Sequence, residues 1–159
     1  MTSRPYSVLL LLAGAVLCPL PAPAQAPADF SLTALAGGVS HHVGIRIVVI
    51  DSTGAGEVCR IDPPDRTGGT CSSTEPAAVT AADRDAIWAA VQGGFLALAP
   101  SLADSSLADG TFAELIVVAN GGTHAVRTQN LSVPAFDAVM AALNAALPPA
   151  QRLVYNALP

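Results

Sequence analysis

The stretch that decides the fold is TFAELIVVANGGTHAVRT, residues 111–128. Its two β-prone runs are joined by Asn120 and Gly121, and this arrangement predicts a hairpin. The reason is that a type I′ turn needs positive φ at both central residues, which asparagine and glycine tolerate. With these two residues at the turn, counting outward places Val117 opposite His124. The stretch therefore predicts an antiparallel ribbon of known register.

This register separates the ribbon into two faces. One face is apolar and needs a helix or a second layer to cover it, because successive strand residues point to opposite sides. The other face places Glu114 opposite Arg127, which predicts an opposite-charge cross-strand pair. The apolar face consists of Ala113, Leu115, Val117 and Val126.

The first 24 residues are typical of a cleaved secretory signal. Arg4 precedes an apolar run at residues 8–17, and small residues and prolines follow it. That run is too short to cross a bilayer, which takes about 20 residues. Cys18 raises the alternative of a lipidated cysteine, but the bulky Leu17 before it argues against that site. We expect a cleaved signal peptide over residues 1–24, a single α+β domain over residues 25–159, and a periplasmic or secreted location.

Removal of this signal leaves two cysteines, Cys59 and Cys71, in an oxidising compartment. One disulfide between them is the expected outcome, and the loop it closes corresponds to roughly 3 kcal/mol in the chain-entropy model. A zinc site is the alternative, but neither cysteine has a partner two to four residues away. The spacing therefore favours the disulfide.

The charge of the chain excludes several classes of partner. The formal net charge is −5, it becomes −6 without Arg4, and the chain contains no lysine. An acidic domain without a basic stretch is a poor candidate for binding nucleic acid or an anionic membrane. We expect neither nucleic-acid binding nor an integral membrane span.

Hydrophobic periodicity predicts the remaining elements. Alternating or β-branched runs indicate strands at residues 30–35, 44–51 and 57–61, and irregular loops are expected at residues 62–78 and 101–110. Hairpins joined by helices, without alternating βαβ units, indicate an α+β fold. We expect an antiparallel sheet of two or more hairpins, with two helices packed on one face and one disulfide.

Two helices are predicted from their caps and apolar stripes. Thr80 is the expected N-cap of the first, with Asp83 three residues on, and Ser132 is the expected cap of the second, with Pro134 in its first turn. In the first stripe Trp88 is interpreted as core in preference to a ligand platform. The stripes are Ile87, Trp88 and Val91, then Phe136, Val139, Met140, Leu143 and Leu147.

The candidate binding residues are three arginines on separate strands, Arg46, Arg60 and Arg127. If all three project from the open face of the sheet, they form a row able to hold a carboxylate or an acidic partner. The alternative is that they pair with neighbouring acidic residues on a solvated surface, where ion pairs are common and weak.

The candidate metal ligands are the three histidines, His41, His42 and His124. Adjacent strand residues point to opposite faces, so His41 and His42 are unsuited to hold one ion together. One of them with His124 and a carboxylate is the alternative site. The chain contains no nucleophile motif, phosphate-binding glycine loop or metalloprotease helix, so no catalytic residue and no cofactor is predicted.

The layout resembles a class of small bacterial secreted proteins and lipoproteins of unknown function. The resemblance rests on the turn at residues 51–54, the helix end at Gly94 and Phe95, the Asp-Gly pair at residues 109–110, and the helix opened by Pro134. It spans residues 44 to 147 and carries no active-site residue.

These observations favour a secreted or periplasmic, non-enzymatic binding module. Its partner is expected to be an envelope or extracellular protein, contacted through the loop at residues 62–78 and the arginines. A small metal-binding protein or hydrolase-like enzyme that uses His124 with His41 or His42 is the first alternative. A structural envelope protein is the second.

Overall fold

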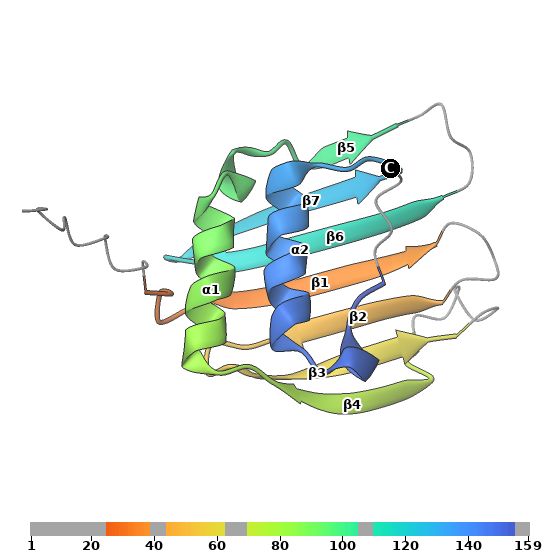
Figure 1. The fold of residues 1–159 in the computed structure, drawn as a ribbon, viewed down its shortest axis with the longest axis horizontal. Coiled ribbons are helices and arrows are strands. Elements are labelled where there is room, and N and C mark those ends of the chain that lie inside the picture. Colours follow the sequence, from red (N-terminus) through yellow and green to blue (C-terminus); the bar gives the residue numbers. More distant parts are fainter. Residues whose placement is uncertain (1–24, 39–43, 63–69, 105–109, 155–159) are drawn as a thin grey trace, which may run out of the picture.

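The computed structural model describes residues 25–38, 44–62, 70–104 and 110–154, so the predicted signal peptide lies outside the described residues. Two α-helices lie side by side and antiparallel across one face of a single sheet (Figure 1). The elements in chain order are β1 (Ser31–Gly38), β2 (Ile45–Ile50), β3 (Ala55–Ile61), β4 (Ser73–Ala78), α1 (Ala81–Gln92), η1 (Phe95–Ala97), β5 (Ser101–Ala103), β6 (Thr111–Ala119), β7 (Gly122–Gln129), α2 (Pro134–Ala146) and η2 (Pro149–Gln151).

The sheet has seven strands in the order β4-β3-β2-β1-β6-β7-β5. All neighbouring pairs are antiparallel except β5 and β7, which are parallel. β1 lies at the centre, between the two hairpins β2-β3 and β6-β7. The predicted α+β class, with two helices on one face of a mostly antiparallel sheet, is confirmed.

The β6-β7 hairpin has the register that its turn predicted. Asn120 has φ of 53° and Gly121 has φ of 72°, as a type I′ turn requires, and Val117 faces His124. The carboxylate of Asp29, just before β1, accepts the backbone N–H groups of Asn120 at 2.9 Å and Gly121 at 2.7 Å. The chain before the central strand therefore holds the tip of the hairpin.

The core lies between the sheet and the two helices. The predicted apolar face of the hairpin is buried there, and both predicted helix stripes face it. Phe30 and Phe95 fill the core beside the helices, and each is at most 1% exposed. Trp88 is also core, as predicted, at 5% exposed, and its ring meets the Phe30 ring edge-on at 5.5 Å.

The start of α1 follows its predicted capping box. The Thr80 hydroxyl accepts the Asp83 N–H at 3.1 Å, and the Asp83 carboxylate accepts the Thr80 N–H at 3.0 Å. The predicted cap of α2 is wrong, because the N-cap is Val133 and Pro134 is the first helical residue. Ser132 instead donates its hydroxyl to the Asp137 side chain at 2.6 Å. Proline at the first position has no N–H group that needs a cap.

Two segments predicted to be irregular form edge strands. Residues 73–78 form β4 and residues 101–103 form β5, where loops were expected. Neither strand shows a recognisable strand pattern in the sequence, because β4 contains Pro76 and β5 is only three residues long. An edge strand tolerates proline because one side of its backbone needs no ladder hydrogen bond. Tertiary pairing with β3 and β7 overrides the weak local preference.

The face of the sheet opposite the helices carries the predicted Glu114 and Arg127 positions. The two residues face each other in the register, as expected, but the described structure contains no ion pair between them. The Arg127 guanidinium lies over the ring of Phe112 at 5.0 Å from the ring centroid. A cation–π contact therefore takes the place of the expected cross-strand ion pair.

Candidate functional site

Two of the three candidate arginines lie directly side by side. Arg46 of β2 faces Arg60 of β3 in the register, on the side of the sheet that also carries buried Val48. Arg127 belongs to the opposite face, because it pairs with Glu114, and it lies on β7, four strands from β3 in the sheet order. The three arginines therefore do not form one row, and the site consists of the Arg46–Arg60 pair.

The turn between β2 and β3 determines this pairing. The Asp51 carboxylate accepts the Thr53 N–H at 2.7 Å and the Thr53 hydroxyl at 2.6 Å, an arrangement that closes a turn locally. Gly54 follows with φ of 90°, a conformation that favours glycine. The turn leaves Ile50 facing Gly56, and counting back from that pair brings Arg46 opposite Arg60.

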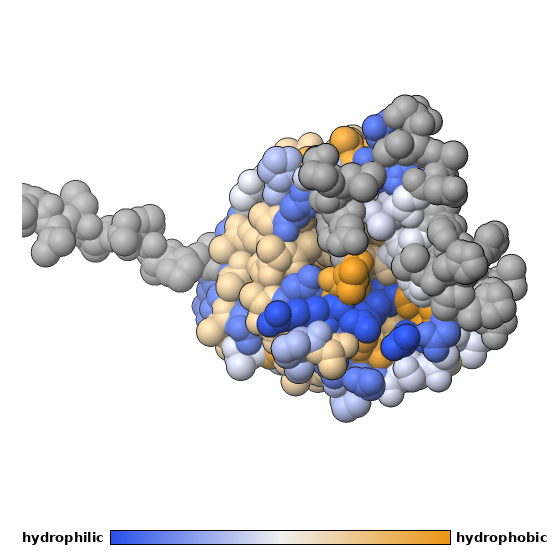
Figure 2. Space-filling view, turned by 45° about the vertical axis from the view of Figure 1, so that its right-hand side comes forward, coloured by the Kyte–Doolittle hydropathy of each residue, from blue (hydrophilic) through white to orange (hydrophobic). Residues whose placement is uncertain are grey.

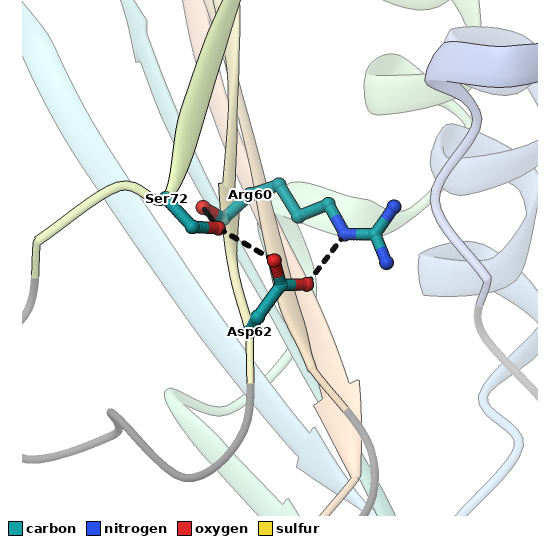
Figure 3. Close-up of polar contacts among 3 residues, drawn as sticks. All are labelled: Arg60, Asp62 and Ser72. Carbon is teal, nitrogen blue, oxygen red and sulfur yellow. Dashed lines mark hydrogen bonds and ion pairs between the residues drawn. The ribbon is translucent and has the colours of Figure 1, made fainter.

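Arg60 is oriented by two neighbours. Its Nε donates to Asp62 Oδ1 at 2.7 Å, and the Ser72 hydroxyl lies 3.0 Å from Asp62 Oδ2 and 2.8 Å from the Arg60 carbonyl oxygen (Figure 3). The Ser72 N–H donates to the same carbonyl at 2.7 Å. The two terminal guanidinium nitrogens of Arg60 point away from Asp62 and donate to no described residue.

The electrostatics of Asp62 follow from these contacts. The hydrogen bond from the Arg60 side chain lowers the pKa of the Asp62 carboxyl, and the hydrogen bond from Ser72 lowers it further. Asp62 is therefore ionised at neutral pH. One edge of the Arg60 guanidinium is neutralised while the other edge keeps its donors.

The Cys59–Cys71 disulfide lies next to this cluster. The bridge forms as predicted, with Cα atoms 5.4 Å apart, and each cysteine is adjacent in sequence to a residue of the cluster, Arg60 or Ser72. It closes the segment between β3 and β4 and so keeps Ser72 beside Asp62. The disulfide thus supports the orientation of Arg60 as well as the pairing of β4.

The segment after α2 contacts Arg46. Arg46 is half-buried, and its Nη1 donates to the carbonyl oxygen of Arg152. Asn144 of α2 holds the next residue by two hydrogen bonds, because its Oδ1 accepts the Leu153 N–H at 2.8 Å and its Nδ2 donates to the Leu153 carbonyl at 2.9 Å. This segment crosses back over the sheet beside α2 (Figure 1).

Two hollows adjoin the arginine pair and share both side chains. One has a volume of about 260 Å³ and extends from the pair to Ala36 and Val154. The other, of about 200 Å³, extends to Ser73 and Glu75. Val154 is 71% exposed. Figure 2 shows strongly hydrophilic side chains gathered in the lower middle of the visible face, next to exposed apolar ones.

This arrangement is suited to holding an anion. Like charges directly opposite each other on a sheet destabilise it, so the pair carries a local energetic cost. A carboxylate placed between two guanidinium groups would offset that cost and accept several charge-assisted hydrogen bonds.

Of the three candidate histidines, the structure describes His124 alone. His41 and His42 lie outside the described residues, so the predicted metal site stays a prediction. His124 lies on the helix-facing side of β7, and its ring meets the Phe95 ring edge-on at 5.3 Å. Within residues 25–38, 44–62, 70–104 and 110–154, no three His, Cys, Asp or Glu side chains gather closely enough to hold a metal ion.

The residues that orient the arginines are not predicted by the sequence pattern. Asp62 and Ser72 lie in the stretch predicted to be an irregular loop, and the sequence predicts no role for Asn144. A signal for Asp62 was present, since it follows Arg60 by two residues, a spacing that places both side chains on one side of a strand. Asn144 had no local signal, because its partner Leu153 comes from the next segment.

Neither the helices nor a comparison with known proteins assigns a function to the chain. Across the described ranges, none of the helices has the length and hydropathy that a membrane span requires. A comparison of the chain with protein-family models finds no match, and a comparison with curated proteins finds no relative. The geometry of the Arg46–Arg60 pair is therefore the feature of the described structure that points to a function.

Proposed function

We propose that the chain is a secreted or periplasmic, non-enzymatic binding module that recognises a carboxylate-bearing segment of an envelope or extracellular protein at the Arg46–Arg60 pair. The observation that carries the proposal is the direct cross-strand opposition of two arginines on an otherwise acidic chain. Such a pair costs stability in isolation and repays it when an anion binds.

The surroundings of the pair support a protein ligand. Arg60 is largely exposed and has unused terminal donors, while Asp62 and Ser72 restrain its rotamers. Restraint of this kind lowers the entropic cost of binding. Exposed Val154 adds an apolar contact beside the charges, which suits an acidic peptide with a neighbouring apolar residue better than a free ion.

Export is supported by two features. The signal-like pattern at residues 1–24 predicts secretion, and the Cys59–Cys71 bridge is of a kind that persists in oxidising compartments. These features favour a location where the proposed partner would be an envelope or extracellular protein.

The test is a calorimetric titration with an acetylated tetraglutamate peptide, with tetraglutamine as the uncharged control. We expect the tetraglutamate peptide alone to bind, with affinity that falls as salt rises. Hydrogen bonds to charged groups contribute about 1.5–3 kcal/mol each, so Arg46→Gln with Arg60→Gln should weaken binding tenfold or more.

Arg127→Gln is the matched control, because it removes the same charge from the opposite face of the sheet. It should change the affinity less than twofold. An equal loss in this variant would reveal general charge attraction in place of a site. Absence of tetraglutamate binding to the unmodified protein would overturn the proposal.

A further inference from the structure

Glu75 lies beside the Arg46–Arg60 pair without forming an ion pair with it. In the register Glu75 of β4 faces Val58, so it lies on the side of the sheet that carries both arginines. The ion pair found within the described ranges joins Arg60 to Asp62, at 2.7 Å. The charge of Glu75 is therefore not taken up by the neighbouring arginines.

The Glu75 carboxylate also has acceptor positions to spare. Glu75 is exposed, and the described contact to its carboxylate is a hydrogen bond from Gln151 Nε2 at 3.4 Å. A bond of this length is weak, and an ionised carboxylate accepts about four hydrogen bonds. A cation brought by a ligand would therefore find unused acceptors at Glu75.

The two hollows beside the pair extend in opposite directions across the sheet. The hollow of about 260 Å³ reaches Ala36 of β1 and Val154, and the hollow of about 200 Å³ reaches Glu75 of β4. In the strand order β4-β3-β2-β1 the arginines of β2 and β3 lie between these two ends. Drug-sized ligands occupy pockets of about 300–1,000 Å³, so each hollow suits a single side chain.

We propose that the ligand of the Arg46–Arg60 pair is an extended peptide segment whose acidic residue lies between an apolar residue and a basic residue. This inference rests on the proposed function and adds the basic residue to it. The ligand acid contacts the two arginines, the apolar side chain lies beside Val154, and the basic side chain pairs with Glu75. Opposite charges then meet at both ends of the polar part of the site.

The strand spacing indicates how far apart these three ligand residues lie. β1 and β4 are three strand positions apart in the sheet, which corresponds to about 14 Å at roughly 4.8 Å for each position. In an extended peptide every second side chain faces the same way, and an advance of four residues covers about 13 Å. The apolar, acidic and basic residues are therefore expected at alternate positions of the segment.

The test is a calorimetric titration with an acetylated and amidated peptide of the sequence Leu-Ser-Glu-Ser-Lys. A second peptide, with glutamine in place of the lysine, is the matched control because it lacks only the cation. The lysine peptide should bind about fivefold more tightly, which is the size expected of a partly exposed ion pair. Both peptides are also made in reverse order, since an extended segment can lie in either direction, and the tighter-binding order is compared.

A third peptide tests the alternate spacing. Moving the lysine next to the glutamate, in Leu-Ser-Glu-Lys-Ser, turns the cation to the other side of the segment at unchanged composition. This shifted peptide should bind no more tightly than the glutamine peptide. Equal binding of the shifted and the first peptide would reveal general charge attraction in place of the Glu75 contact, and it would overturn the inference.

The variant Glu75→Gln assigns the preference to one side chain. It should bind the lysine and glutamine peptides equally, because an uncharged amide offers the lysine no opposite charge. It should also bind tetraglutamate more tightly than the unmodified protein does, because a like charge beside the site is removed. Glu114→Gln is the control, since it removes the same charge from the opposite face of the sheet, and it should keep the fivefold preference.

The remaining outcomes separate this inference from the proposed function. Equal binding of the lysine and glutamine peptides to the unmodified protein, in both orders, overturns the inference, and so does a preference that survives in Glu75→Gln. If tetraglutamate binds in either case, the proposed function stands. If neither the peptides nor tetraglutamate binds, the proposed function itself fails. The comparison of peptides needs no variant, so the test stands even if Glu75→Gln does not fold.

Discussion

Arg46 and Arg60 occupy directly opposed positions on β2 and β3, so two positive side chains adjoin each other in a chain of net charge −5. Arg46 contacts the carbonyl of Arg152, and Arg60 contacts Asp62. Each arginine has its own partner. The repulsion between them is available to be relieved by a ligand.

A double-mutant cycle measures this repulsion. We expect Arg46→Gln combined with Arg60→Gln to lose more stability than the sum of the two single changes, by about 0.2–1 kcal/mol. The reason is that each single change already removes the whole repulsion, whereas the double change removes it only once. The free energy of unfolding in urea at low salt is the measurement. Strict additivity would mean that the two guanidinium groups do not interact.

Loss of the disulfide should destabilise the protein. Replacing Cys59 and Cys71 together by serine opens the loop that they close, which corresponds to about 3 kcal/mol in the chain-entropy model. Urea unfolding of the variant, compared with the oxidised parent, gives the value. The parent measured under reducing conditions should match the variant, and a reduced parent as stable as the oxidised one would contradict this prediction.

Asp29 should make stability depend on pH. The N–H groups of Gly121 and then Asn120 lower the pKa of its carboxyl, so the folded state binds the proton more weakly than the unfolded chain. This stabilisation is fully present above the unfolded pKa, near 4, and is lost as the pH falls through the folded pKa. Asp29→Asn should therefore be less stable than the parent at pH 7, and the difference should shrink on acidification.

The measurement for Asp29 is urea unfolding at a series of pH values from neutral downward. Glu57→Gln is the control, because the Glu57 side chain is exposed and has no hydrogen bond to a described residue. It should not change the pH profile in the same range. A difference between Asp29→Asn and the parent that stays constant with pH would show that the hairpin contact does not depend on the charge.

Gly54 should resist substitution. It has φ of 90°, and an added Cβ would meet the carbonyl oxygen of Val79 at 2.5 Å. A side chain there combines backbone strain with a clash, so Gly54→Ala should cost about 1–3 kcal/mol. Gly122→Ala is the control, because its Cβ would lie 3.6 Å from the nearest atom, an ordinary contact. Thermal unfolding of both variants checks the contrast, and equal losses would contradict it.

Local chemistry accounts for the elements that were predicted correctly. The Asn120-Gly121 turn sets the register of its hairpin because positive φ restricts the turn to one geometry. Thr80 and Asp83 begin α1 because each satisfies a backbone N–H of the other residue. Neither the turn nor the start of α1 depends on a residue far away in the chain.

Local chemistry does not predict the edge strands or the face of the sheet on which the arginines lie. Pro76 opposes strand formation in isolation, yet β4 pairs with β3, and the disulfide closes the segment between these strands. The alternation around Arg46 and Arg60 is the same whichever face is covered, so period alone does not say which side the helices occupy. The geometry of the turn after Asp51 and the place of α2 settled their position.

The sequence by itself determined the α+β class, the β6-β7 hairpin, the two helix stripes and the disulfide, because hydrophobic period, turn chemistry and cysteine count act within short stretches. Only the tertiary structure decided which side chains meet. It placed the Arg46–Arg60 pair on the helix-facing side of the sheet beside the segment after α2, separated Arg127 from it, and placed His124 beside Trp88 in the lining of one pocket. These contacts join segments far apart in the chain, and their geometry depends on strand order and helix packing, which no local pattern encodes.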